Sequence, residues 1–188
     1  MAGIVFPADV MYLERAMNNE YFDRIEKGEA YVEGSPYITH QRHWGSSVVL
    51  DANTRIHFIV GEPSAHFHKY RTEDYILHAG DMVVYRGPVF EGDLEKTISN
   101  LEEVHLRPGD RVVIPPQTVH IPINSSPEGS TFVEISHGPY AEEDIVRVYD
   151  KNGRDSELVK KWLELGYEEG ISVKDLIPLI RGKFKNSQ

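Results

Sequence analysis

Three histidines and one glutamate occur in this sequence with the spacing of metal ligands. The stretch GEPSAHFHKYRTEDYILHAG contains His66, His68 and Glu73. Alternate side chains of a strand share one face, so the two histidines would project together. Glu73 would return to the same point if the segment KYRT turns the chain into a neighbouring antiparallel strand. A second stretch, GDRVVIPPQTVHIPIN, supplies His120 after a tight Pro-Pro turn.

This set of residue types has the chemistry of an open metal site. An isolated HxH with a nearby glutamate is more often a group of ordinary surface residues, and it is the second stretch that favours a metal site. Three neutral imidazoles and a carboxylate suit Mn, Fe, Co, Ni or Zn and are poorly suited to Ca. Four protein ligands on an ion that accepts about six leave about two positions for water or for two substrate oxygens. We therefore expect one divalent metal ion, held by His66, His68, Glu73 and His120.

The elements that must position these ligands are predicted to be strands. From about residue 47 to residue 135 the sequence consists of short β-rich runs separated by Gly, Pro and Asn. Many short strands with frequent turns predict an antiparallel sandwich or barrel. The runs are SSVVLD, RIHFIVG, AHFH, EDYILHAG, DMVVYRG, EVHLRPGD, RVVIPP, HIPIN and TFVEIS.

Helices are predicted on both sides of the strands. Residues 10–27 have apolar side chains at spacings of three and four, which suits one or two short amphipathic helices. Residues 156–165 and 173–180 predict C-terminal helices, with Ser156 and Ser172 as N-caps and Gly166 as the end of the first helix. Pro178 would shorten or kink the second helix. The form of the acidic insertion EGDLEKTISNLEE is left open by its sequence.

The composition limits the classes of protein to which this chain can belong. With 188 residues, 40% of them hydrophobic, the chain is long enough for one domain with a substantial core. A formal charge of −10 opposes contact with a phosphate backbone and argues against a nucleic-acid partner. Because the chain has no cysteine, a metal must be held by His, Asp or Glu. The N-terminal residues have no basic leader and no apolar run of signal or membrane length, so we expect a soluble, cytoplasmic protein with no membrane partner.

The two histidine-bearing stretches together resemble the paired motifs of the cupin superfamily. Those motifs run as a glycine, HxH, a later glutamate and glycine, then a glycine, a proline and a final histidine followed by asparagine. Here the gap from Gly61 to His66 is one residue shorter than usual, and Gln117 stands where the second motif often has glycine. Neither departure removes a ligand. The matching residues are His66, His68, Glu73, Gly80, Gly109, Pro115, His120 and Asn124.

The resemblance implies a fold and an assembly. The fold would be mainly β, a single antiparallel cupin β-barrel of the jelly-roll type with short N-terminal and C-terminal helices. One cupin domain would cover residues 1–188, with a helical or extended segment at 1–40, the barrel at 41–150 and helices at 151–188. A homodimer is also implied, because cupin barrels commonly associate through strands or N-terminal segments.

Further motifs resemble two groups of cupin sugar isomerases. HFHKYRTED is similar to the HFHxxxxED pattern of D-lyxose isomerases. RHWG at residues 42–45 and EEDIVRVYDKNGR at residues 142–154 resemble the cupin domain of type II mannose-6-phosphate isomerases, and this second resemblance is the more specific because the motifs recur in order. Both groups are aldose–ketose isomerases. The resemblance therefore implies proton transfer between C1 and C2 of a sugar through an enediol, with manganese as the first choice of metal.

Glu134, in the run TFVEIS, is the residue that we expect to move the carbon proton. The lyxose isomerases have a glutamate in a similar late strand, and alternation with Phe132 and Ser136 allows an inward direction. On pattern alone, a surface glutamate on an edge strand is an equally good interpretation.

Four further residues are candidates for binding the sugar. Arg55 begins the run RIHFIV, where related isomerases have a basic residue, and Lys69 directly follows the histidine pair. Asp144 and Arg147 belong to the EEDIVR motif and are candidates for binding sugar hydroxyls or relaying a proton. For each of the four, the alternative is an ordinary surface charge or salt bridge.

The acidic composition and the lyxose-isomerase motif favour a neutral sugar. We expect conversion of D-lyxose to D-xylulose, with D-mannose to D-fructose as a second activity because the two aldoses share their configuration around the reacting carbons. Isomerisation of mannose 6-phosphate is the alternative that the EEDIVR region favours. Two other classes stay open, an Fe(II)-dependent cupin dioxygenase with the same ligands and a non-catalytic sugar-binding cupin.

Overall fold

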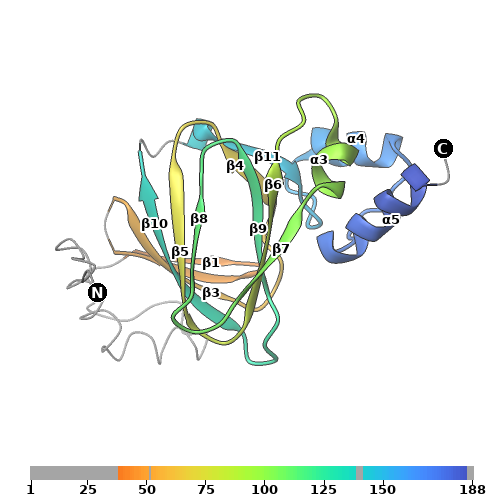
Figure 1. Cartoon of the computed structure of the whole chain (residues 1–188). Helices are drawn as coiled ribbons and strands as arrows, with labels where there is room; N and C mark the ends of the chain where they lie inside the picture. The colour runs from red at the N-terminus through yellow and green to blue at the C-terminus, as the bar shows by residue number, and fades with distance from the viewer. Residues whose placement is uncertain (1–37, 51, 139–141, 186–188) are drawn as a thin grey trace, which may run out of the picture.

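Two antiparallel sheets face each other across the interior of the protein (Figure 1). The structure is a computed structural model that describes residues 38–50, 52–138 and 142–185. The helices predicted at residues 10–27 lie outside the described residues. Within them, the predicted mainly β jelly-roll fold is confirmed.

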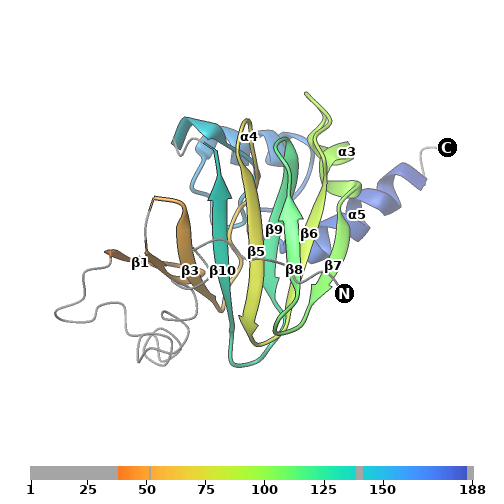
Figure 2. The ribbon, with the colours of Figure 1, turned by 60° about the vertical axis from the view of Figure 1, so that its left-hand side comes forward.

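Most strands that follow one another in the sequence lie in opposite sheets. The strands are β1 (Ile38–Arg42), β2 (Gly45–Val49), β3 (Thr54–Ile59), β4 (Ala65–His68), β5 (Thr72–Ala79), β6 (Met82–Pro88), β7 (Glu102–Leu106), β8 (Arg111–Ile114), β9 (Thr118–Asn124), β10 (Ser130–His137) and β11 (Ile145–Tyr149). The first sheet has the order β1-β2-β3-β10-β5-β8 and the second has the order β11-β4-β9-β6-β7. Figure 2 shows β3, β10, β5 and β8 of the first sheet side by side. Consequently β4 and β9 of one sheet face β5 and β10 of the other.

The nine predicted runs form strands β2 to β10, with ends that differ by a few residues. Strands β1 and β11 are additional. Their inward positions carry Arg42 and Arg147, which line a cavity instead of an apolar core. Charged residues at these positions hide the apolar period of two by which a strand is recognised.

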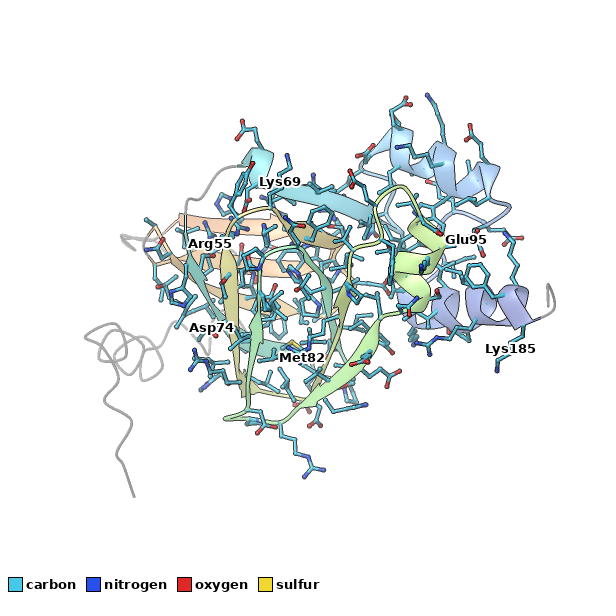
Figure 3. All side chains as sticks on the ribbon, turned by 45° about the horizontal axis from the view of Figure 1, so that its top comes forward. Arg55, Lys69, Asp74, Met82, Glu95 and Lys185 are labelled. Atoms are coloured by element: carbon cyan, nitrogen blue, oxygen red, sulfur yellow. The ribbon has the colours of Figure 1, made fainter. Side chains whose placement is uncertain are left out.

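Apolar side chains fill much of the space between the two sheets (Figure 3). Leu77 and Phe132 come from the first sheet, and Met82 and Val84 come from the second. All four are buried, and burial of each such side chain stabilises the fold by about 1.5–3 kcal/mol. The same cluster includes Tyr75, so the packing of the core also fixes one wall of the cavity described below.

Three helices gather on one side of the barrel, α3 (Leu94–Ser99), α4 (Ser156–Glu164) and α5 (Val173–Lys185) (Figure 1). Helix α3 lies within the acidic insertion. Trp162 of α4 is buried and donates its Nε1–H to the Val148 carbonyl of β11 at 2.8 Å. Leu176 and Ile180 of α5 are buried in the same apolar cluster. In the part of the chain that the structure describes, no helix has the length and apolar content needed to cross a membrane.

The ends of the C-terminal helices correct two predictions. The N-cap of α4 is Asp155 instead of Ser156, because the Asp155 carboxylate accepts the Leu158 N–H at 3.1 Å. Helix α5 continues through Pro178, since the buried Leu176 and Ile180 on either side of the proline anchor it to the core. The predicted end of α4 at Gly166 is confirmed by a φ of 88° there.

Helix α5 begins on a buried carboxylate from a distant loop. The predicted N-cap Ser172 does accept the first helical N–H groups with its carbonyl. However, its hydroxyl donates to Glu62 Oε2 at 2.6 Å, and the Val173 N–H donates to Glu62 Oε1 at 2.8 Å. Glu62 therefore supplies the side-chain cap and ties α5 to the loop that precedes β4.

A turn with unusual backbone geometry leads into β9. Gln117 has a φ of 58°, and among the described residues it is the only non-glycine residue with a positive φ. This left-handed conformation costs about 1–2 kcal/mol for a residue with a Cβ, which accounts for the glycine that the cupin motif often has here. The Gln117 N–H donates to the His68 carbonyl at 2.7 Å, so the turn is bonded to a strand that bears predicted ligands.

Candidate metal centre and cavity

His66, His68, Glu73 and His120 meet in the interior of the barrel. Strand β4 supplies the first two, and β9 supplies His120 in direct register with His66. Glu73 comes from β5 in the opposite sheet. One potential ligand atom from each residue lies within 4.8 Å of the other three. Glu73 Oε1 is 2.9 Å from His68 Nε2, and Glu73 Oε2 is 3.2 Å from His120 Nε2.

Polar contacts at Nδ1 orient the three imidazoles. The Nδ1 atoms of His66 and His120 each lie against the backbone carbonyl two residues earlier, at 2.9 and 3.0 Å. A carbonyl only accepts, so each Nδ1 carries the proton and each Nε2 has a free lone pair in the neutral ring. His68 Nδ1 faces Asp144 Oδ2 at 3.3 Å, which favours the same tautomer. All three Nε2 atoms are thus presented as ligands.

The electrostatics of the group keep His66 and Glu73 in metal-binding protonation states. Burial lowers the pKa of His66 well below its ordinary value, and the charges of His120 and His68 lower it further. Burial alone would raise the pKa of Glu73, but the close contacts and charges of His120 and His68 hold it well below its ordinary value. A neutral His66 and an ionised Glu73 are the forms that ligate a metal.

The donor set fits a divalent ion. The side chain of His120 is completely buried, and its Nε2 makes no hydrogen bond within the described ranges. A buried nitrogen without a hydrogen bond is uncommon unless it serves another purpose such as ligation. These residues could hold a metal ion, and three imidazoles with one carboxylate suit Mn, Fe, Co, Ni or Zn alike.

Arg71 and Tyr75 hold the carboxylate of Glu73, a role that the sequence did not reveal. Arg71 donates from Nε to Glu73 Oε1 at 3.0 Å and its Nη2 lies 2.9 Å from the same oxygen. The Tyr75 hydroxyl donates to Glu73 Oε2 at 2.9 Å. Burial raises the pKa of Tyr75 well above its ordinary value, so the hydroxyl keeps its proton and stays a donor. Such contacts fix the orientation of a ligating carboxylate.

Glu134 of β10 lies on the inner face of the sheet that also supplies Glu73, and three donors hold it there. His57 Nε2 is 2.9 Å from Glu134 Oε2, while Arg55 Nη1 and Ser136 Oγ lie 3.3 and 3.2 Å from Oε1. The His57 ring is itself stacked on Phe132, with 4.9 Å between ring centroids and 22° between planes. The position of the carboxylate is therefore fixed by the packing of the sheet.

The same contacts keep Glu134 ionised. Burial raises its pKa and the charge of Glu73 adds to that effect, but the hydrogen bond and charge of His57 and the charge of Arg55 outweigh both. The net pKa lies below its ordinary value. Glu134 is consequently a carboxylate at neutral pH and can accept a proton.

A cavity of about 630 Å³ is lined by His66 and Glu73 of the metal group and by Glu134. His66 borders it from one sheet and Glu73, Glu134 and His57 from the other, while Trp44 and Phe132 supply apolar walls. Its volume is within the range of small-molecule sites. The interior therefore combines a donor set, a carboxylate base and enclosed space for a ligand.

The four predicted sugar-binding residues are not all brought to this cavity. Arg55 and Arg147 line it. Asp144 does not, because it is buried behind His68, where it faces His68 Nδ1 and accepts the Tyr70 N–H at 2.9 Å. Asp144 thus contacts a predicted ligand and does not line the cavity.

Lys69 also lies away from the cavity. Lys69 directly follows β4, and alternation of side chains puts it on the same face as Phe67. Both residues line a separate cavity, which is also lined by residues of α3 and α4. Figure 3 shows Lys69 at the periphery of the barrel.

His57 is the main cavity residue that the sequence interpretation missed. It follows Arg55 by two positions and so shares its face of β3. That alternation was a usable signal for its inward direction. Its pairing with Glu134 depends on the register of β3 against β10, which no local pattern specifies.

No protein-family model matches the sequence, and no curated protein sequence matches it. Among solved structures, the chain is similar to the oxalate decarboxylase–formate complex of Lactobacillus farciminis, with 18% identity over 74% of this chain and 40% of that chain and a TM-score of 0.51. This likeness concerns the fold alone. The fold is a cupin-type jelly roll.

Two weaker likenesses add nothing to the assignment of the fold. The capsular polysaccharide assembling protein CapF of Staphylococcus aureus has 14% identity over 74% of this chain and 39% of that chain, with a TM-score of 0.48. The L-ribose isomerase of Cellulomonas parahominis has 20% identity over 52% of this chain and 57% of that chain, with a TM-score of 0.43. The chain covers less than two thirds of the length of each of these proteins.

Proposed function

We propose that this chain is a metal-dependent aldose–ketose isomerase. The observation that carries the proposal is that one cavity is lined by two members of a donor set for a divalent ion, His66 and Glu73, and by Glu134, an ionised carboxylate held by His57 and Arg55. Isomerisation of a sugar needs both stabilisation of negative charge on two sugar oxygens and a base that moves a proton between adjacent carbons. The HFHKYRTED and EEDIVR motifs support the same reaction.

Each component has a defined task. A divalent ion held by His66, His68, Glu73 and His120 would supply Lewis-acid stabilisation of the negative charge that develops on the sugar oxygens. Glu134 removes the proton from C2 of the aldose and returns it to C1, while the hydroxyl proton passes from O2 to O1. The product is the ketose, formed through an enediol with no change in composition.

The surroundings of Glu134 serve this proton transfer. His57 and Arg55 hold the carboxylate in one position, which removes the entropic cost of orienting it during the reaction. Trp44 and Phe132 exclude water from the reacting carbons.

For the sugar, D-lyxose to D-xylulose is the first proposal, with D-mannose to D-fructose second. Isomerisation of mannose 6-phosphate is the other candidate. It is favoured by a specific observation, the number of arginines that line the cavity. A cytoplasmic homodimer is the proposed form of the protein.

The proposal is tested by an oxygen-free assay of the metal-stripped protein restored with Mn(II). D-lyxose, D-mannose and mannose 6-phosphate are supplied separately, and ketose is measured. The expected result is ketose from at least one sugar, with none from metal-stripped protein. If none of the three sugars gives ketose and the Fe(II)-loaded protein consumes oxygen, the result would contradict the isomerase and indicate an oxygenase. Absence of both activities would leave a sugar-binding protein.

A further inference from the structure

A second cavity, of about 690 Å³, lies between the outer face of strands β4 and β11 and the helices α3 and α4 (Figure 1). Phe67 and Val146 line it from the strands, and Leu94 lines it from α3. Phe90, in the loop before α3, and Leu165, at the end of α4, add to its apolar lining. This space is the outer cavity, and the cavity of about 630 Å³ inside the barrel is the barrel cavity.

One pair of strands separates the two cavities. In the register of β4 and β11, Phe67 lies opposite Val146 and His66 lies opposite Arg147. His66 and Arg147 line the barrel cavity. Because successive side chains of a strand project to opposite faces, Phe67 and Val146 point away from it. Among the described lining residues, Arg147 alone borders both spaces, so the outer cavity is a separate site on the other face of the same wall.

The fold leaves the apolar lining of the outer cavity only partly buried. Phe67, Val89, Leu94 and Leu165 pack against the apolar cluster on the helical side of the barrel, but each remains half-buried. Apolar atoms that face open space lose the dispersion contacts that they would make in a packed interior. Apolar surface that is gathered and left open usually marks a site of interaction. A bound molecule would complete the burial of these side chains.

Hydrogen bonds fix the walls of the outer cavity. The Phe90 N–H donates to Thr97 Oγ1 at 3.0 Å, which holds the loop against α3. The bond from Trp162 Nε1 to the Val148 carbonyl, at 2.8 Å, holds α4 against β11. A cavity bounded by fixed elements costs little to organise when a ligand binds. Its volume lies in the range of small-molecule sites, and enclosure by strands, loop and helix favours a small molecule over a protein segment.

The charges at the outer cavity favour neither an anion nor a cation. Asp93 caps α3, and Glu95 accepts hydrogen bonds from Tyr167 and Lys183. The other exposed charged side chains among the described lining residues are two of each sign, Lys69 and Lys161 with Glu91 and Glu164. Because exposed charges are screened by water, they offset little of the cost of burying a charged group in an apolar cavity. An uncharged ligand is therefore favoured.

We propose that the outer cavity is a second binding site, which takes a small uncharged molecule with an aromatic ring system. The rings of Phe67 and Phe90 reach the cavity from two distant segments, and aromatic rings gain from contact with one another beyond the area that they bury. Polar substituents of the ligand would lie at the charged mouth. The inference does not depend on the proposed isomerase function, because Phe67, Phe90 and Val146 do not line the barrel cavity.

Three naphthalenes that differ in one substituent test this site. At neutral pH, 2-naphthol is uncharged, 2-naphthoate is an anion and 2-naphthylmethylamine is a cation. Backbone amide chemical shifts of the isotope-labelled full chain, followed during titration, give both the place of binding and the dissociation constant. We expect 2-naphthol to shift the amides of Phe67, Phe90 and Val146, and to bind about threefold or more tightly than either charged compound.

Matched variants show whether the outer cavity is the place of binding. Val146→Trp fills the cavity from its strand wall and is expected to weaken binding of 2-naphthol by about tenfold or more. The control, Val113→Trp, makes the same change at an exposed strand position outside the cavity and is expected to leave the affinity unchanged. Phe90→Leu, which removes a ring from a loop and keeps an apolar side chain, provides a second variant if Val146→Trp is poorly folded, with an expected loss of about threefold.

Four results would overturn the proposed site. They are no saturable binding of 2-naphthol, shifts confined to residues of the barrel cavity such as Trp44 and Phe132, tighter binding of a charged naphthalene, and full affinity in both Val146→Trp and Phe90→Leu. Saturable binding that shifts the outer-cavity amides and is weakened by these variants, but not by Val113→Trp, would support it. Neither result bears on ketose formation, so the test of the isomerase stays independent.

Discussion

Glu134 combines the properties required of a carbon base, because it is buried, ionised and held by three donors. We predict that Glu134→Gln, which keeps the shape and removes the charge, lowers kcat by about 100- to 10,000-fold. Bound metal should remain at one ion per chain, since Glu134 is outside the group of four ligands. Ketose formation and metal content are measured on the same sample. Unchanged kcat would exclude Glu134 as the base.

The His57–Glu134 hydrogen bond predicts a shift in the pH profile. His57→Phe preserves a ring against Phe132 but removes the hydrogen bond and charge that lower the pKa of Glu134. The pKa of Glu134 should therefore rise. A base is active only when ionised, so activity is lost as pH falls through this pKa, and the acid limb of kcat/KM should move to higher pH.

The control for this shift is His105→Phe at an exposed position outside the cavity. It should leave the acid limb in place. An acid limb that does not move in His57→Phe would show that Glu134 does not determine the low-pH loss of activity.

At the level of single residues, the sequence identified the candidate metal ligands better than the residues that hold the side chains of the site in position. His66, His68, Glu73 and His120 stand in two recognisable stretches, and the structure brings all four together. Arg71, His57 and Asp144 act through contacts between segments that are distant in sequence or through the rotamers of neighbours. No periodic pattern specifies such contacts, which is why the sequence indicated neither the contact of Asp144 with His68 nor the role of Arg71.

At the scale of elements, the N-terminus of α4 distinguishes two adjacent capping candidates. We predict that Asp155→Ala lowers the free energy of unfolding by about 1 kcal/mol, because it removes the acceptor of the Leu158 N–H. Ser156→Ala, at an exposed position inside the helix, should change it by less than about 0.5 kcal/mol. Urea unfolding curves of both variants provide the measurement. A larger loss for Ser156→Ala would contradict the assignment of Asp155 as the cap.

Apolar alternation identified strands that pack on the core, and it is missing from β1 and β11. The inward positions of β6 and β8 carry Met82, Val84, Val112 and Ile114, whereas those of β1 and β11 carry Arg42 and Arg147. The pattern that identifies a strand depends on burial of apolar side chains. It therefore fails where the fold uses the inner face for charge, which is also where function is expected.

At the scale of the whole molecule, a metal bound between the two sheets should stabilise the fold. An ion at a concentration 100 times its Kd contributes about 2.7 kcal/mol, which corresponds to a rise in Tm of about 5–10 °C for a chain of this size. We predict such a rise on adding Mn(II) to metal-stripped protein, followed by thermal unfolding. His66→Ala should abolish it, and His137→Ala, an exposed histidine outside the group of ligands, should retain it. Equal Tm values with and without Mn(II) would contradict a metal that bridges the sheets.

The measurement that tests the central claim most directly is ketose formation as a function of the ratio of Mn(II) to protein, without oxygen. The account predicts activity that rises linearly and reaches its plateau at one ion per chain, because the described residues contain a single group of four candidate ligands, two of which line the cavity together with Glu134. Activity that is already complete without metal, or no ketose at any ratio from D-lyxose, D-mannose or mannose 6-phosphate, would contradict it.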